Sequence, residues 1–240
     1  MPTTATIIYY SSNREDPVFE ARVQARLVEH AQGLPIISVT QIPSTLGTNI
    51  CLGVMTPSNV TLYQQLLAGA EAATTPFVIN AESDFLYPPE YFTFRPPELD
   101  LIYRYAPIRL LTQYHDWGAF PKRYSEGAQI VGRTYLIGLL RRALATVPTH
   151  LDADAFRKWS RRMNPYRNVP YAVYGSDVPA LTFKTDAGLH RFSKLNLGSV
   201  RTLPLWGDVR EIRQTMFGAP VLWRYGTPTT MKETTDENSK

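Results

Sequence analysis

The feature that most constrains this chain is a short apolar run at residues 77–81 that stops at two acidic residues, Glu82 and Asp84. A continuous apolar run of this length is typical of a strand buried on both faces, as in a parallel sheet. Ligands of open α/β sheets bind just beyond the carboxyl ends of such strands. Two carboxylates at that point can hold a hard divalent cation, which can in turn hold a diphosphate. The alternative is that these two acids only cap a loop.

The segments around this run alternate between strand and helix patterns. Asp16 and Pro17 are typical of a helix N-cap and first helical position, and Ser58 is a second candidate N-cap. A strand, helix and strand order of this kind favours a parallel crossover unit. We therefore predict an α/β fold with a Rossmann-like, mostly parallel central sheet and flanking helices. The predicted elements are strand 6–10, helix 16–33, strand 35–40, loop 41–57, helix 58–73 and strand 77–82.

The second half of the chain is predicted to be irregular and helical. Residues 85–107 are rich in proline, which is excluded from central strands and helix interiors, so irregular chain or an edge strand is expected there. The apolar spacing then predicts helices at 126–144 and 152–163 and short strands at 171–174 and 180–183. We expect one domain over residues 1–226, followed by a polar flexible tail at 227–240.

Composition sets broad limits on the class of protein. Hydrophobic residues make up 44% of the 240 residues, enough for a sizeable core, and no apolar run approaches the ~20 residues needed to span a bilayer. The net charge of +4 is compatible with phosphate-bearing partners. The first residues lack the basic region of a signal peptide, so a cytoplasmic location without membrane contact is expected. Cys51 lies between Ile50 and Leu52 and is predicted to be a buried structural thiol.

Several catalytic motifs are missing from the sequence. It has no Gly-x-Gly-x-x-Gly, no Walker loop, no His-Glu-x-x-His and no Gly-x-Ser-x-Gly, which argues against dinucleotide dehydrogenases, P-loop enzymes and the common hydrolases. His190 is a candidate ligand that completes a metal site begun by Asp84, or else an exposed loop histidine. Asp116 is a candidate catalytic base, or else a turn acid before Gly118, and Asp177 is a weaker candidate base.

Polar residues follow the first two predicted strands. Ser11, Asn13 and Arg14 follow the first strand, where a nucleobase and ribose can rest, and Asn49 lies in the loop after the second. Because the loops that follow parallel strands emerge at one edge of a sheet, these side chains and the acid pair are expected at the same edge. Solvated loop residues are the alternative.

A basic segment with interleaved aromatic residues lies at residues 157–167. Its cations can contact phosphates and give salt-dependent binding to a nucleic acid, and Trp159 or Tyr166 can stack on a base. The alternative is a solvated helix face with Trp159 in the core. The cations of this segment are Arg157, Lys158, Arg161, Arg162 and Arg167.

Six sequence segments together resemble a known family. They are Tyr9-Tyr10-Ser-Ser-Asn13-Arg14, residues 33–39, Asn49-Ile50, residues 65–73, Glu82-Ser83-Asp84-Phe-Leu-Tyr87-Pro88-Pro89 and Arg201-Thr-Leu-Pro-Leu-Trp206-Gly207. The combination is similar to small glycosyltransferases of bacteriophages and bacteria with the metal-dependent nucleotide-sugar (type A) fold. Some phage members are linked to adding sugars to hydroxymethylated pyrimidines in DNA. About half of the chain is covered, most clearly residues 6–92.

The resemblance implies a glycosyl transfer from a nucleoside diphosphate sugar, such as a UDP-sugar, to a hydroxyl acceptor. Residues 1–92 would bind the donor and residues 93–226 the acceptor, DNA being expected, with no obligate protein partner. A Mn²⁺ or Mg²⁺ ion would lie on Asp84 with help from Glu82. Two other classes stay open: transfer to a polysaccharide or small molecule, and a non-catalytic nucleic-acid-binding protein, because Ser83 stands where the family has histidine. The implied donor contacts are Tyr10, Ser11, Asn13, Arg14, Asn49 and Gln65.

Overall fold

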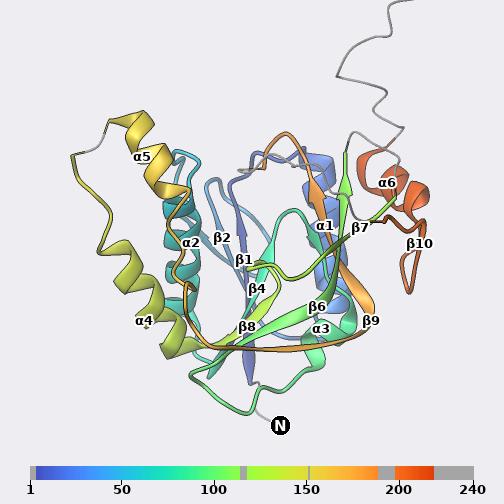
Figure 1. Ribbon diagram of the computed structural model, residues 1–240, viewed down its shortest axis with the longest axis horizontal. Coiled ribbons are helices and arrows are strands. Elements are labelled where there is room, and N and C mark those ends of the chain that lie inside the picture. Colours follow the sequence, from blue (N-terminus) through green and yellow to red (C-terminus); the bar gives the residue numbers. More distant parts are fainter. Residues whose placement is uncertain (1–3, 114–117, 151, 189–197, 219–240) are drawn as a thin grey trace, which may run out of the picture.

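The computed structural model describes residues 4–113, 118–150, 152–188 and 198–218. Within these ranges nine strands form one sheet in the order β3-β2-β1-β4-β8-β6-β9-β5, with β7 paired to β6 (Figure 1). The strands of this sheet are β1 Ala5–Ser11, β2 Ile36–Thr40, β3 Thr48–Cys51, β4 Phe77–Glu82, β5 Phe85–Leu86, β6 Ile102–Thr112, β7 Phe120–Lys122, β8 Gln129–Gly132 and β9 Tyr171–Lys184. A separate two-stranded ribbon pairs β10 Thr202–Leu203 with β11 Gly207–Asp208.

The predicted parallel unit is confirmed in the first half of the chain, where β3, β2, β1 and β4 run parallel. Its two helices begin where the capping residues predict. The Asp16 carboxylate accepts hydrogen bonds from the first turn of α1 Pro17–His30, and the Ser58 hydroxyl accepts one from the Thr61 N–H at the start of α2 Asn59–Ala72. The second half is mixed, since β8 pairs antiparallel with both β4 and β6. The α/β class holds, and the parallel order is restricted to part of the sheet.

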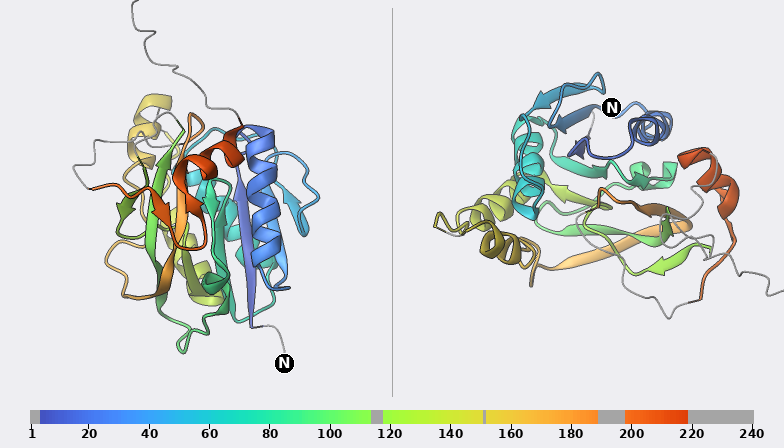
Figure 2. Two further views of the ribbon diagram at one scale, coloured as in Figure 1. Left: turned by 90° about the vertical axis from the view of Figure 1, so that its right-hand side faces the viewer. Right: turned by 90° about the horizontal axis from the view of Figure 1, so that it is seen from above.

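Helices cover both faces of the sheet (Figure 2). Alternate residues of β1 show the two sides: Ile7 and Tyr9 pack in the core with α1, and Ile8 and Tyr10 pack in the core with α2. One layer contains α2, α4 Arg133–Leu144 and α5 Ala153–Ser160, and the other contains α1, α3 Pro89–Thr93 and α6 Val209–Phe217. Among the described residues, no helix is long and apolar enough to cross a membrane.

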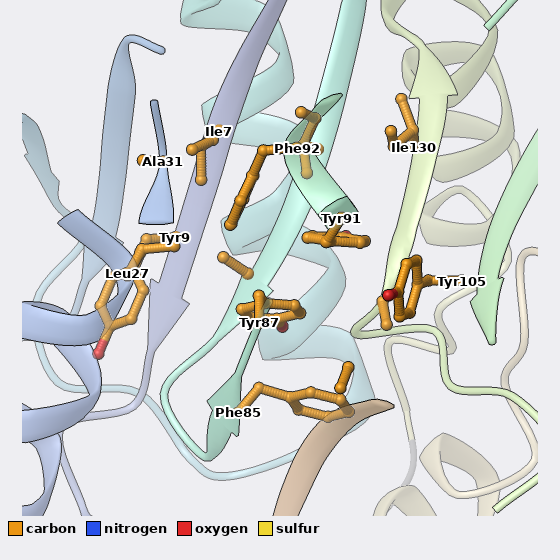
Figure 3. Close-up of a cluster of buried hydrophobic side chains, with 14 of the residues drawn as sticks. Ile7, Tyr9, Leu27, Ala31, Phe85, Tyr87, Tyr91, Phe92, Tyr105 and Ile130 are labelled. Carbon is orange, nitrogen blue, oxygen red and sulfur yellow. The ribbon is translucent and has the colours of Figure 1, made fainter. Parts of the chain in front are cut away.

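A cluster of buried aromatic rings supports the end of β4 (Figure 3). Tyr87 stacks on Phe85 and Tyr91 with ring centroids 5.2 and 4.6 Å apart, and Tyr91 also meets Tyr105 edge to face. The Tyr91 hydroxyl reaches the Asn80 carbonyl oxygen at 2.7 Å, which belongs to β4, and the carbonyl oxygen of β8 residue 129 at 3.1 Å. The cluster therefore ties β4 and β8 together just before the acid pair.

The prediction of irregular chain or an edge strand at residues 85–107 is wrong at 89–93, which form α3, and at 102–107. Residues 102–107 belong to β6, an inner strand between β8 and β9. Pro107 is accommodated because the register between β6 and β9 shifts between Ala106 and Ile108, and proline is tolerated at such irregularities. The two short strands predicted at 171–174 and 180–183 are one long strand, β9. Gly175 lies within it, where a Cβ atom would overlap the Ala106 carbonyl oxygen.

The predicted helix at 126–144 begins later than expected. Residues 129–132 form β8 and only residues 133–144 are helical, because the apolar run at 130–131 fits a buried strand as well as a helix. The predicted loop at 41–57 contains β3, the edge strand of the sheet. Cys51 lies on that edge and is exposed, so the prediction of a buried thiol is wrong.

Candidate functional site

A cavity of about 500 Å³ opens at the carboxyl ends of β1 and β4. Arg14 from the loop after β1, residues 57–65 from the start of α2, and Glu82 and Asp84 after β4 form one side. Lys122 at the end of β7, with Tyr124, Ser125 and Glu126 after it, forms another side. Arginines that follow α5 complete it. The cavity therefore lies at the sheet edge that the strand order predicts for a ligand.

Glu82 is held in place by three neighbours. The Tyr10 hydroxyl donates a hydrogen bond to Glu82 Oε1 at 2.7 Å. The Glu82 N–H donates to the Tyr87 hydroxyl at 2.9 Å, and that hydroxyl donates to the Gly127 carbonyl oxygen at 2.6 Å. A Cβ atom on Gly127 would overlap the Glu82 carboxylate, so a larger residue here would displace the Glu82 side chain. The carboxylate is thus fixed at the floor of the cavity before any ligand binds.

Burial and a neighbouring carboxylate disfavour the ionised form of Asp84. Burial and, after it, the neighbouring Glu82 raise the pKa of Asp84 to about 8, while Lys184 and Lys122 act in the opposite direction. Burial also lowers the pKa of Lys122. Two close carboxylates in a partly desolvated site repel one another, and a bound cation would relieve that repulsion.

This balance predicts a pH-dependent stability for the metal-free protein. The raised pKa means that the folded state holds a proton on Asp84 up to about pH 8, whereas the unfolded chain releases it near pH 4. The folded state thus binds more protons in between, so the free energy of unfolding falls as the pH rises, by up to about 1.4 kcal/mol per pH unit. Urea unfolding in a chelator at pH 5 and pH 8 measures the change. Asp84→Asn should flatten it, and equal slopes for both proteins would contradict this account.

The acid pair fits a divalent cation in its donor chemistry. Carboxylate oxygens are the ligands that Mg²⁺ and Mn²⁺ prefer, and one or two carboxylates suffice when substrate phosphates supply the remaining ligands. In the described ranges no group of three or more His, Cys, Asp or Glu side chains could hold a metal ion by itself. Glu82 and Asp84 would therefore hold a cation together with a phosphate ligand. His190 lies outside the described residues.

Of the six predicted donor contacts, Tyr10, Arg14 and Gln65 line the cavity beside the acid pair. Gln65 is buried, and its side-chain amide donates to the Ser11 carbonyl oxygen at 2.7 Å and to the Val39 carbonyl oxygen at 3.0 Å. Gln65 therefore connects α2 to the ends of β1 and β2. These hydrogen bonds stabilise the strand ends at which the cavity opens.

The other three predicted contacts are not among the lining residues. The Ser11 hydroxyl accepts a hydrogen bond from the Asn13 N–H, and Asn13 Oδ1 accepts from the N–H groups of Gln41 and Ile42. The Asn49 amide donates to Ser38 and Thr40 on β2. These side chains shape the loops around the cavity. The predicted base Asp116 lies outside the described residues.

The basic segment is divided between the cavity and the surface. Arg161, Arg162 and Arg167 line the cavity, although the sequence pattern alone does not separate them from the other two cations. Arg157 pairs with Asp154 at the surface of α5, with side chains 61% and 75% exposed, and Lys158 is exposed and does not line the cavity. Trp159 is half-buried against the core, as the alternative reading of this segment expects.

Sequence reasoning missed many of the cavity residues. Glu126 accepts hydrogen bonds from the Tyr63 hydroxyl at 3.0 Å and from the Asn164 amide at 2.9 Å, and burial raises its pKa. The sequence pattern places Glu126 at the first position of a predicted helix, although Gly127 beside it indicates a turn. Those that bear on the chemistry of the site include Lys122, Tyr124, Glu126 and Lys184.

No protein-family model matches the sequence, and no curated protein matches it. Among solved structures, the chain is similar to a glycosyltransferase involved in glycosylation of the major capsid of PBCV-1 (TM-score 0.43, 10% identity, 74% of this chain and 91% of that one). It is also similar to S. aureus TarS 1–349 with UDP-GlcNAc (0.41, 8%, 76% and 59%). A third is the catalytic domain of Drosophila beta1,4galactosyltransferase 7 (0.39, 11%, 71% and 63%).

Proposed function

We propose that this protein is a metal-dependent glycosyltransferase that moves a sugar from a nucleoside diphosphate sugar, UDP-sugar being favoured, to a hydroxyl acceptor. The proposal rests on one observation: Glu82 and Asp84 lie at the carboxyl end of β4 in a cavity large enough for a nucleotide and lined also by cations. Buried carboxylates repel a diphosphate unless a cation lies between them. A cation site beside positive side chains is the arrangement that a diphosphate requires.

Each residue near the acid pair has a proposed role that follows from its position in the cavity. Asp84 would bind the cation directly, with Glu82 supporting it directly or through water, and a bound Mn²⁺ or Mg²⁺ would neutralise the charge that develops on the leaving diphosphate. Arg14 lies where it can contact the nucleotide, and Lys122 and Lys184 supply further positive charge beside the acid pair. Tyr10 keeps the Glu82 carboxylate oriented through its hydrogen bond.

A transfer that inverts the sugar needs a carboxylate to remove the acceptor proton. We assign this task to Glu126, which lines the cavity and whose pKa burial raises toward the operating pH. Its hydrogen bonds to Tyr63 and Asn164 fix its position. The sequence-based candidate, Asp116, stays a prediction. A retaining transfer needs neither residue as a base.

The experiment that tests this function measures UDP release from a panel of UDP-sugars without an acceptor. Slow release in Mn²⁺ that stops in a chelator supports the proposal. A protein that releases no nucleotide from any sugar donor, with or without metal, would contradict it. A transferase for polysaccharides or small molecules would give the same donor reaction, so the acceptor needs its own test.

For the acceptor we propose DNA, in particular a hydroxymethylated pyrimidine. The support is that Arg161, Arg162 and Arg167 line the same cavity as the acid pair, where they can contact the phosphates that flank a target nucleotide. Exposed Arg157 and Lys158 extend the positive surface along α5. A base inside a duplex would have to be flipped out to reach the cavity.

This acceptor predicts salt-dependent DNA binding. The double variant Arg161→Ala/Arg162→Ala should bind duplex DNA about tenfold more weakly at low salt and with a shallower salt dependence, because two phosphate contacts are lost. Fluorescence anisotropy against salt concentration measures both. The matched control removes two exposed arginines outside the cavity, Arg26→Ala/Arg142→Ala, and should retain the wild-type slope. Equal losses in both double variants, or affinity that ignores salt, would exclude this role.

A further inference from the structure

We infer that Tyr124 is a stacking platform for the base of the acceptor nucleotide, so that the acceptor class is nucleic acid rather than carbohydrate. This inference rests on the proposed function, because it assigns a part of the same cavity to the acceptor. Tyr124 lies in the segment after β7 that also supplies Glu126 to the cavity, and it is 40% exposed.

The Tyr124 ring contacts a buried cation and a second tyrosine. The Arg104 guanidinium carbon lies 4.5 Å from the centroid of the Tyr124 ring and 4.2 Å from the centroid of the Tyr171 ring. The guanidinium thus lies in the corner between two tyrosine rings whose centroids are 6.0 Å apart and whose planes are tilted by 44°. Tyr124 and Tyr171 are equally exposed, but of the two only Tyr124 is among the residues that line the cavity. One ring face of Tyr124 is therefore covered by a cation, and the residue is part of the cavity lining.

Arg104 makes this platform rigid. It extends from β6 and is 5% exposed, so its side chain is fixed by packing within the sheet layer. The positive charge of Arg104 also favours the ionised form of Glu126, the residue proposed to remove the acceptor proton. A ring held on a buried cation loses little conformational freedom when a ligand stacks on it, and such preorganisation favours binding.

The surroundings of Tyr124 favour a nucleic acid over a sugar chain. Three arginines of the basic segment line the same cavity, and a cationic groove with an aromatic platform is the combination that binds single-stranded nucleic acid. A neutral oligosaccharide gives those arginines no anionic partner. A flipped-out base offers both a planar ring for Tyr124 and flanking phosphates for the arginines.

The test compares a twelve-residue thymidine oligonucleotide with an abasic strand of equal length and charge, each labelled for fluorescence anisotropy. The wild type should bind the thymidine strand about tenfold more tightly or better, because one stacked base contributes on that scale. Tyr124→Ala should bind both strands alike, and Tyr124→Phe should restore the preference, because phenylalanine keeps the ring. Tyr171→Ala is the matched control, with the same exposure and the same contact to Arg104, and should keep the wild-type preference.

Three outcomes would overturn the inference. They are equal effects of Tyr124→Ala and Tyr171→Ala, a wild type that does not distinguish the two strands, and a wild type that binds a neutral oligosaccharide in place of DNA. UDP binding in Mn²⁺, measured on the same wild-type sample, separates these failures from failure of the proposed function. A protein that binds UDP but shows no base preference contradicts only the stacking role of Tyr124. A protein that binds neither UDP nor DNA contradicts both that role and the proposed function.

Discussion

Asp84→Asn is expected to reduce Mn²⁺-dependent UDP release from a UDP-sugar by about a thousandfold. Several kcal/mol of transition-state stabilisation are lost when a cation no longer sits on the leaving diphosphate, and each ~1.4 kcal/mol corresponds to a tenfold change in rate. The substitution keeps the size of the side chain and matches the neutral form that the raised pKa of Asp84 favours, so the fold should persist. Initial rates at saturating donor measure the effect.

The control for this substitution is Asp177→Asn. Asp177 is an exposed carboxylate on β9 that does not line the cavity, although the sequence made it a weak candidate base. It should release UDP at the wild-type rate. An Asp84→Asn variant that keeps its rate, or an equal loss in both variants, would remove Asp84 from the proposed cation site.

Tyr91→Ala is expected to destabilise the protein by about 3–5 kcal/mol, a large part of the ~5–15 kcal/mol that holds a typical domain folded. The ring is fully buried, stacks on Tyr87 and meets Tyr105, and its hydroxyl bridges the carbonyl oxygens of β4 and β8. Alanine leaves a cavity and removes that bridge. Urea unfolding followed by far-UV circular dichroism measures the loss.

Tyr91→Phe separates the ring from the hydroxyl. It keeps the packing and removes the bridge, so about 1–3 kcal/mol should be lost. The surface control Val18→Ala, at a side chain that is 57% exposed on α1, should change stability by no more than about 0.5 kcal/mol. A loss for Tyr91→Ala as small as that of the control would show that the aromatic cluster does not support the sheet.

The first half of the fold followed from the sequence because its signals are local. Asp16, Pro17 and Ser58 mark helix starts through contacts within one turn, and the apolar run at 77–81 fits only a buried element. The second half depends on distant partners. Pro107 lies in an inner strand because the register between β6 and β9 shifts beside it. Residues 129–132 form a strand, β8, because β4 and β6 flank them. Neither partner is visible in the local pattern.

In the candidate site too, residues with local sequence signals were predictable and residues placed by distant contacts were not. The acid pair was predictable, since it ends a strand whose direction was known, and its place in the cavity agrees with that reasoning. Asn13 and Asn49 have the residue types of ligand contacts, yet their amides are used by neighbouring loops and strands. Tyr124 and Glu126 were missed because their role comes from the turn between β7 and β8 that faces the acid pair, a tertiary arrangement that spacing does not encode.

The central claim is a cation-dependent nucleotide site at Asp84, and thermal unfolding with Mn²⁺ and a panel of nucleoside diphosphates tests it most directly. A ligand present at 100 times its dissociation constant stabilises the folded state by about 2.7 kcal/mol, which raises the unfolding temperature measurably. The account predicts a rise with at least one diphosphate, UDP being favoured, that requires Mn²⁺ and is absent in Asp84→Asn. A rise that persists in a chelator or in Asp84→Asn, or no rise with any diphosphate, would contradict it.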